Sequence, residues 1–340
     1  MPKINFGGTI ERVITRKEFP LKKARQVLKN ETIAIIGYGV QGQAQSLNLK
    51  DNGFNVIVGQ RKGKSWGKAK KDGWAPAKNL FSIKKACQKG TIICYTLSDA
   101  GQKKIWGKIK KYLTKGKTLS FAHGFSIVYQ DQTEVIPPED IDVIMAAPKG
   151  PGILVREKGV GASYAIYQDV TGKAKQKALA LCMGINSTCI YETTFKKEVY
   201  GDLTGERGVL VGAMAGLMEA QYNELRKRGH TPSEAFNETV EEATRNLIPL
   251  IDKNGMEWMF ANCSTTAQRG ALDWRHEFRK AVEPVFKRLY DSVESGHETK
   301  IVLKANSSPN YRSKLAKELK ELGDSEMWKA GKAVRQLRYL

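Results

Sequence analysis

Two pairs of carboxylates are the residues of this chain best suited to hold a metal ion. Asp202 and Glu206 stand four residues apart, and so do Glu238 and Glu242, in segments whose composition predicts helices. Residues at that spacing lie on one face of an α-helix, so each helix directs two oxygen ligands toward one point. Two such helices facing each other would make a four-carboxylate site, which suits a hard divalent cation such as Mg²⁺.

The surroundings of the first pair favour a metal over the alternative of a solvated helix face. Asp202 and Glu206 lie among glycines and apolar residues, including Gly205, Gly208 and Val209. Carboxylates placed in such a setting without compensation cost several kcal/mol each. We therefore expect a cation to accompany them.

A glycine-rich turn upstream has the spacing of a dinucleotide-binding fingerprint. It follows an apolar run at residues 32–36 and precedes a helical segment, and it consists of Gly37, Tyr38, Gly39, Val40, Gln41 and Gly42. The first glycine allows a tight turn, the second lets the backbone approach a pyrophosphate, and the third permits close helix–strand packing. The phosphates would lie at the helix N-terminus, where free amides favour anions. This context favours a cofactor site over an incidental glycine turn.

The residues that follow the next predicted strand favour NADPH as the cofactor. An NAD-binding domain carries an acid roughly 20 residues after the glycines. At that distance this chain has three cations and a hydroxyl, namely Arg61, Lys62, Lys64 and Ser65. Such groups suit a 2′-phosphate, which an acid would repel. The alternative is a solvated loop in a lysine-rich protein.

The elements that must position these residues fall into two regions. Short β-branched runs alternate with helical segments at residues 32–36, 55–58, 91–95, 118–121, 142–146, 162–166 and 187–190. This pattern predicts a doubly wound α/β domain with a parallel sheet covered on both faces. Strand signals stop after Thr193, and helices are expected at 207–228, from a capped start at Thr231, at 274–295 and at 313–322. We expect a cofactor-binding domain at 1–192 and an all-helical domain at 193–340.

Composition limits the partners and the cellular location that we expect for the protein. The chain has 340 residues, 41% of them hydrophobic, and a formal net charge of +21. Its lysines are spread along amphipathic segments, without an aromatic-interleaved patch or a zinc finger, which predicts a solvated basic surface and no nucleic-acid partner. The longest apolar run, at residues 208–218, is far shorter than the roughly 20 residues of a membrane span. Five scattered cysteines without a C-x-x-C pair, and no secretory signal, favour reduced thiols and a cytoplasmic location.

Four motifs together resemble those of the ketol-acid reductoisomerases, the acetohydroxyacid isomeroreductases. They are the glycine turn extended to Ala44, the loop Ala147-Pro148-Lys149-Gly150-Pro151-Gly152, the string from Asp202 to Gly208, and Cys263-Ser264-Thr265-Thr266-Ala267. The resemblance covers nearly the whole chain, including Ser295-Gly296-His297-Glu298, and the length matches the short form of the family.

The resemblance implies a Rossmann domain, a knotted all-helical C-terminal domain, and the use of NADPH and two Mg²⁺ ions. The substrate would be 2-acetolactate or 2-aceto-2-hydroxybutyrate, in branched-chain amino-acid biosynthesis. Asp202 and Glu206 match the family's metal ligands. Glu238 and Glu242 match a second acidic pair that a partner subunit supplies in short-form homodimers or higher homo-oligomers. Ser264 matches a substrate contact, His123 and Lys149 match polar active-site residues, and Pro148 lies in the loop beside the nicotinamide.

The chemistry of such a reaction agrees with this assignment. Alkyl migration needs a deprotonated alcohol and a polarised ketone, which paired Mg²⁺ ions supply as Lewis acids, and a hydride donor then reduces the new ketone. Glu242 and a hydroxide held by the metal are both candidates for the base. Two positions depart from the family pattern: Arg207, where glutamine is common, and Ile153, where histidine is common. A metal-free hydroxyacid dehydrogenase and a non-catalytic basic regulator are the rival hypotheses.

Overall fold

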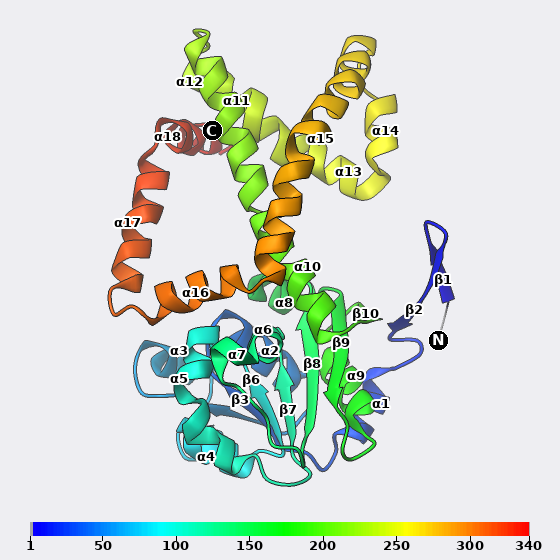
Figure 1. Ribbon diagram of the computed structural model, residues 1–340, viewed down its shortest axis with the longest axis vertical. Helices are drawn as coiled ribbons and strands as arrows, with labels where there is room; N and C mark the ends of the chain where they lie inside the picture. The colour runs from blue at the N-terminus through cyan, green and yellow to red at the C-terminus, as the bar shows by residue number, and fades with distance from the viewer. Residues whose placement is uncertain (1–2, 340) are drawn as a thin grey trace. The chain divides into compact units, whose positions relative to one another are not determined.

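The protein divides into two compact units in the computed structural model, which describes residues 3–339 (Figure 1). Unit 1 is Met1–Tyr200 and unit 2 is Gly201–Leu340. Unit 1 holds the strands, and unit 2 consists of helices and their connections. Within residues 3–339, no helix combines the length and the apolar composition needed to cross a membrane.

Unit 1 is built on one ten-stranded sheet with the order β1-β2-β10-β9-β8-β7-β6-β3-β4-β5. The strands are β1 (Lys3–Phe6), β2 (Thr9–Thr15), β3 (Ile33–Ile36), β4 (Val56–Gly59), β5 (Leu80–Phe81), β6 (Ile92–Tyr95), β7 (Thr118–Phe121), β8 (Asp142–Pro148), β9 (Ala162–Gln168) and β10 (Cys189–Glu192). The six from β5 to β8 in this order are parallel. The strand order reverses between β3 and β6: β4 and β5 follow on one side of β3, and β6, β7 and β8 on the other. Doubly wound sheets bind their ligands at such a switch point.

The other strands add an antiparallel margin that the apolar pattern did not predict. β9 pairs antiparallel with β8, from Pro148↔Ala162 to Val143↔Gln168, and β2 pairs antiparallel with β10. The α/β class is confirmed, but β9 and β10 run opposite to the other predicted strands. An apolar run reports that a strand is buried and carries no information on its direction. The hairpin of β1 and β2 was missed because its residues are mostly exposed.

Helices cover both faces of the sheet, and alternate residues of β3 show this directly. Ile33 and Ile35 belong to one buried cluster with residues of α1 (Leu21–Val27), α2 (Val40–Asp51) and α9 (Ala174–Gly184). Ala34 and Ile36 belong to another with α4 (Ile83–Lys89) and α5 (Asp99–Ile109). The remaining helices of this unit are α3 (Lys64–Lys71), η1 (Lys110–Tyr112), α6 (Phe125–Val128), α7 (Gln130–Thr133) and α8 (Gly152–Glu157). The sheet is therefore doubly wound.

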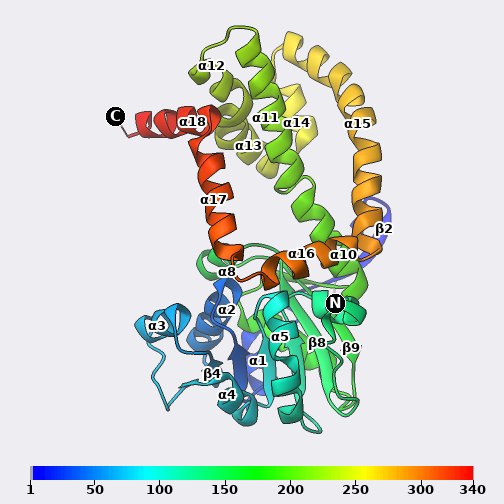
Figure 2. The same ribbon diagram turned by 60° about the vertical axis from the view of Figure 1, so that its left-hand side comes forward.

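Unit 2 is helical, and one helix, α10 (Phe195–Arg207), runs from unit 1 into it. The others are α11 (Gly212–Lys227), α12 (Pro232–Phe236), η2 (Asn237–Glu241), η3 (Ala243–Leu247), α13 (Ile248–Asn254), α14 (Met256–Ala261), α15 (Thr265–Glu294), α16 (His297–Ser307), α17 (Tyr311–Asp324) and α18 (Glu326–Leu337). α15 has 30 residues, and both views show it as a long helix (Figures 1 and 2).

The single helix expected at 207–228 is wrong, because the chain breaks between α10 and α11. Turn bonds replace the helical ladder there: the Leu210 N–H donates to the Gly205 carbonyl, and the Ala213 N–H to the Gly208 carbonyl. A Cβ on Gly212 would lie 2.2 Å from the Arg207 carbonyl oxygen, so only glycine allows this turn. The predicted end and restart are confirmed: Gly229 has φ +94°, and Thr231 and Glu234 form a capping box.

The segment after α12 is a π-helix, whereas the sequence predicted an α-helix. Thr239 Oγ1 donates to the Ala235 carbonyl at 2.7 Å, and Thr244 Oγ1 donates to the Val240 carbonyl at 2.8 Å. These hydroxyls occupy carbonyls four residues back, which competes with the α-helical ladder. A π-helix joins residues five apart and is frequent at functional sites. Glu238 lies in η2, and Glu242 is the residue between η2 and η3.

Candidate functional site

The glycine turn between β3 and α2 has the geometry that the fingerprint requires. Gly37 has φ +104°, a conformation that side-chain-bearing residues rarely adopt. A Cβ on Gly42 would lie 2.0 Å from the Gly37 carbonyl oxygen, so the helix can approach the turn only with glycine there. A Cβ on Gly39, the N-cap of α2, would meet open space. The backbone is therefore accessible at the helix N-terminus, where a pyrophosphate would bind.

The loop after β8 packs directly on this turn. The Gln41 side-chain amide donates to the Gly150 carbonyl at 3.0 Å. A Cβ on Gly152 would lie 2.5 Å from the Val40 carbonyl oxygen, so the two backbones touch. Pro148 is the last residue of β8 and leads into this loop. The structure thus brings two predicted motifs, over 100 residues apart in sequence, to one place.

The basic residues predicted to recognise a 2′-phosphate follow β4 at the same edge of the sheet. β4 ends at Gly59, and Arg61 and Lys62 lead to Gly63, whose φ of +139° begins α3 at Lys64. The first acid after β4 is Asp72, which lies past the end of α3. Asp72 Oδ2 accepts hydrogen bonds from the Tyr38 hydroxyl at 2.8 Å and from Gln43 Nε2 at 2.7 Å. We find this acid bound to neutral donors of the glycine turn and helix α2.

Lys149 has a partner that sequence reasoning missed. Its ammonium Nζ donates to both carboxylate oxygens of Glu198, at 2.7 and 2.8 Å. The Glu198 side chain is 5% exposed, whereas that of Lys149 is 45% exposed. A buried carboxylate thus holds an ammonium group that remains accessible. A signal was present: Glu198, Asp202 and Glu206 are spaced by four residues, so they share one face of α10.

The first carboxylate pair lies on α10, so the predicted helical setting of Asp202 and Glu206 is confirmed. Asp202 is half-buried and Glu206 is exposed. The Arg207 guanidinium comes within 3.9 Å of Glu206, and its Nε donates to Glu298 on α16 at 2.9 Å. Burial of Glu298 opposes its ionisation, but hydrogen bonds from Ser292 and Arg207 outweigh that effect, so the pKa of Glu298 is lowered. Arg207, a residue that departs from the family pattern, thus forms an ion pair with Glu298.

The second pair is not brought to the first within this chain. Glu238 and Glu242 are both exposed. Across residues 3–339, no three His, Cys, Asp or Glu side chains converge closely enough to hold a metal ion. The neighbouring Glu241 accepts hydrogen bonds from Arg338 and Arg245, which lower its pKa and occupy it elsewhere. Glu242 is therefore the better available ligand of the two adjacent acids.

The remaining predicted residues occupy ends of elements. Ser264 is the N-cap of α15, and its Oγ accepts from the Ala267 N–H at 3.3 Å. Its position at a helix N-terminus suits an anionic substrate group. His123 follows β7 and is half-buried, with its ring centroid 6.2 Å from that of Phe125. Ile153 on α8 is 59% exposed, so it leaves that side of the loop open.

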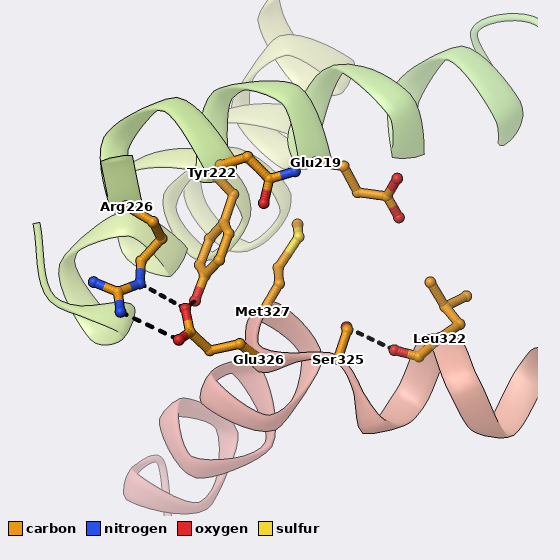
Figure 3. A pocket seen from close by; sticks show the side chains of 8 residues that line it. Glu219, Tyr222, Arg226, Leu322, Ser325, Glu326 and Met327 are labelled. Carbon is orange, nitrogen blue, oxygen red and sulfur yellow. Dashed lines mark hydrogen bonds and ion pairs between the residues drawn. The ribbon is translucent and has the colours of Figure 1, made fainter. Parts of the chain in front are cut away.

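A hollow of about 350 Å³ lies between α11 and the segment joining α17 to α18, and its lining includes none of the predicted site residues. Its lining includes Tyr222, Arg226, Glu326 and Met327 (Figure 3). The Glu326 carboxylate accepts from the Tyr222 hydroxyl at 2.8 Å and from Arg226 Nε at 2.5 Å. Burial and the bond to Glu326 raise the pKa of Tyr222 to about 12. These contacts fasten α18 to α11, and we assign the hollow no ligand.

Comparison with known families adds an independent result. One family model, described as acetohydroxy acid isomeroreductase, NADPH-binding domain, matches residues 27–189. A second, described as ketol-acid reductoisomerase, C-terminal domain, matches residues 195–339. Together the two matches span most of the chain.

Individual relatives agree with the family models. A ketol-acid reductoisomerase (NAD(+)) of Desulfosudis oleivorans is 61% identical, over 99% of this chain and 98% of its own length. A mitochondrial ketol-acid reductoisomerase of Neurospora crassa is 56% identical, over 98% of this chain and 85% of its own. Among solved structures, an NADH-preferring ketol-acid reductoisomerase from an uncultured archaeon superposes with a TM-score of 0.85 at 32% identity, covering 96% of this chain and 99% of that one.

Proposed function

We propose how the residues of this chain divide the work of a ketol-acid reductoisomerase, because the chain belongs to that family. It is an oxidoreductase that rearranges 2-acetolactate or 2-aceto-2-hydroxybutyrate and reduces the product to a 2,3-dihydroxy acid with a nicotinamide cofactor. The proposal rests on the line of acids along α10, where Glu198 holds Lys149 and is followed by Asp202 and Glu206.

Asp202, Glu206, Glu238 and Glu242 would hold two Mg²⁺ ions. Carboxylate oxygens are the ligands that this hard cation prefers, so the donor set fits the metal. When bound, Mg²⁺ supplies Lewis acidity that polarises the ketone and favours loss of the alcohol proton. The chain's own contribution is to present these oxygens from helices, with Arg207 tied to Glu298 beside them. Glu242 remains a candidate for the base, since Glu241 is engaged by two arginines.

Lys149, His123 and Ser264 would act on the substrate. The bidentate contact with Glu198 fixes the Lys149 ammonium, so it can donate to an oxygen that gains negative charge. Ser264 would orient the substrate carboxylate or hydroxyl from the N-terminus of α15. Pro148 would border the nicotinamide, because the loop it begins lies against the glycine turn.

We assign NADPH as the preferred reductant, with Gly37, Gly39 and Gly42 at the pyrophosphate. The chain between β4 and Asp72 carries arginine and lysine but no acid, and cations at this position favour a 2′-phosphate. Two relatives bear names that specify NAD(+) or NADH, so this choice needs a direct test. We expect kcat/KM for NADPH to exceed that for NADH by about tenfold or more, equivalent to one charge-assisted contact. Equal values, or a higher value for NADH, would reject the assignment.

We further propose a homodimer or higher homo-oligomer in which a second copy supplies Glu238 and Glu242 to Asp202 and Glu206. The chain does not gather a metal site by itself within residues 3–339. Unit 2 also exposes large apolar side chains, among them Val209, Leu210, Val211, Trp258, Trp274 and Phe278. Large apolar side chains exposed in this number favour an association surface. We place the enzyme in the cytoplasm, because its five cysteines are all free thiols.

Mixing two inactive variants tests the shared site. Asp202→Asn removes a ligand of the first pair, and Glu238→Gln removes one of the second. Each variant alone should be inactive with 2-acetolactate, Mg²⁺ and NADPH. In a mixed dimer one site carries both defects and the other carries none, so activity should return when the two are dissociated and reassembled together. If the mixture stays inactive while mixed dimers form, the second pair belongs to the same chain. If Asp202→Asn alone retains Mg²⁺-dependent turnover, the metal assignment falls.

A further inference from the structure

Tyr38 is tied to both ends of the basic segment, which we define as residues 61–71. Its backbone N–H donates to Oε1 of Gln60 at 3.0 Å, and Gln60 directly precedes the segment. Its hydroxyl donates to Oδ2 of Asp72 at 2.8 Å, and Asp72 directly follows the segment. Tyr38 itself stands between the first two glycines of the turn. One residue of the pyrophosphate-binding turn therefore fixes both ends of the segment.

The tie at Asp72 is part of a partly buried network. Gln43 Nε2, from the first turn of α2, donates to the same Oδ2 at 2.7 Å. Trp74 Nε1 donates to the Tyr38 hydroxyl at 2.9 Å, and the two aromatic residues are 2% and 1% exposed. Polar groups joined in a hydrogen-bond network hold one another in place. The end of α3 is thereby held at one distance from α2.

The negative charge of Asp72 argues against a purely electrostatic role in binding a phosphate. The segment before it carries six cations, Arg61, Lys62, Lys64, Lys68, Lys70 and Lys71. An acid beside them weakens their attraction for a phosphate. Its position is explained instead by the two bonds that it accepts from the turn and from α2.

We propose that Tyr38 and Asp72 form a clamp that sets the distance between the glycine turn and the basic segment, which makes Asp72 a positioning residue for the cofactor's 2′-phosphate. The inference rests on the proposed use of NADPH. The pyrophosphate and the 2′-phosphate belong to one ligand, so the two protein regions that bind them must keep a fixed separation. Misplacement of a binding group by a fraction of an ångström weakens a charge-assisted hydrogen bond.

Binding of nucleotide fragments tests the clamp without substrate or metal. Calorimetry on the full-length protein compares adenosine 2′,5′-bisphosphate with AMP, which differ by the 2′-phosphate. The wild type should bind the bisphosphate more tightly. Asp72→Ala should lose about fivefold to tenfold of that preference, the loss expected when a charge-assisted bond is weakened. Asp72→Asn should retain the preference, because its amide oxygen can accept both hydrogen bonds.

The sign of the change separates positioning from electrostatics. Removing a carboxylate from a basic region strengthens binding of an anion if only charge matters, whereas loss of the clamp weakens it. Asp140→Ala is the matched control: it removes an exposed carboxylate just before the amino end of β8, whereas the glycine turn follows the carboxyl end of β3, and it should leave the preference unchanged.

Three results would count against the clamp. If the wild type does not prefer the bisphosphate, the NADPH assignment fails and the clamp fails with it. If the wild type prefers it and Asp72→Ala binds it equally or more tightly, the clamp alone is rejected. Should Asp72→Ala not fold, Tyr38→Phe removes the same bond from the other side while keeping the ring. An undiminished preference in Tyr38→Phe would then also reject the clamp.

Discussion

The two units bury their apolar residues to very different degrees. In unit 1, both faces of the sheet are covered, and two buried clusters include β3 residues as little as 0–1% exposed. In unit 2, a buried cluster consists of Tyr222, Ala235, Phe236, Val240 and Met327, while Trp274 and Phe278 on α15 are 64% and 56% exposed. A cofactor-binding fold is thus complete within one chain. The helical unit, in contrast, presents surface and acidic ligands that suit association with another copy.

The largest effect is expected from a substitution in unit 2 that lowers turnover and leaves cofactor binding by unit 1 nearly unchanged. Asp202→Asn should lower kcat with 2-acetolactate by about 10⁴-fold, because a Lewis acid contributes several kcal/mol to the barrier. Its affinity for NADPH, measured by fluorescence titration, should change less than about twofold. A parallel loss of NADPH binding would show that the two functions are not separable in this way.

Breaking a buried ion pair in unit 1 should lower stability by an amount that does not depend on association between copies. Asp142 is 0% exposed and accepts from Lys177 at 3.3 Å and from Thr171 Oγ1 at 2.6 Å. Asp142→Ala leaves the Lys177 ammonium buried without this partner, which should cost about 3–5 kcal/mol in the free energy of unfolding. The cost, measured by urea denaturation, should be the same at low and high protein concentration. A cost that grows on dilution would mean that unit 1 also depends on association.

A substitution in the exposed aromatic pair on α15 should weaken association and leave the fold of the single chain unchanged. Phe278→Ser removes a ring whose centroid lies 6.4 Å from that of Trp274, on a surface that we expect a second copy to cover. Because buried aromatic residues dominate interface energies, the dissociation constant should rise by roughly 30-fold, or about 2 kcal/mol. Sedimentation equilibrium measures it. The far-UV circular dichroism should not change, because the residue is exposed within its own chain, and Lys280→Ser serves as a polar control on the same helix.

The smallest expected effect concerns the contact between α10 and α16. Glu298→Gln weakens the bonds from Arg207 and Ser292 and should cost about 1 kcal/mol near neutral pH. The pKa of Glu298 is lowered in the folded state, so its stabilising contribution is present above the usual value of 4.5 and is lost as the pH falls below it. Denaturation curves of wild type and variant should therefore converge in acid. A difference that persists there would point to packing rather than charge.

Local patterns predicted most of unit 1 and less of unit 2, for physical reasons. Continuous apolar runs predict buried strands, and the glycine turn is specified by residues that are adjacent in sequence. Capping by Thr231 is local too, so it was predicted and found. The break at Gly208–Val211 and the π-helix depend on backbone contacts and threonine hydroxyls that periodicity does not report. The spacing of Glu198 from Asp202 and Glu206 places it on their face of α10, but it does not reveal the bond to Lys149, which is 49 residues away in sequence.

The close approach of Gly152 to Val40 restricts how this chain can change over generations. Neither backbone can move away without disturbing the nucleotide turn, and a methyl group at Gly152 would fall 2.5 Å from a carbonyl oxygen. The conformations of two stretches more than a hundred residues apart in sequence therefore depend on each other. A substitution in either is viable only if it suits the other. Ile153, which is exposed, should tolerate substitution far better than the adjacent Gly152.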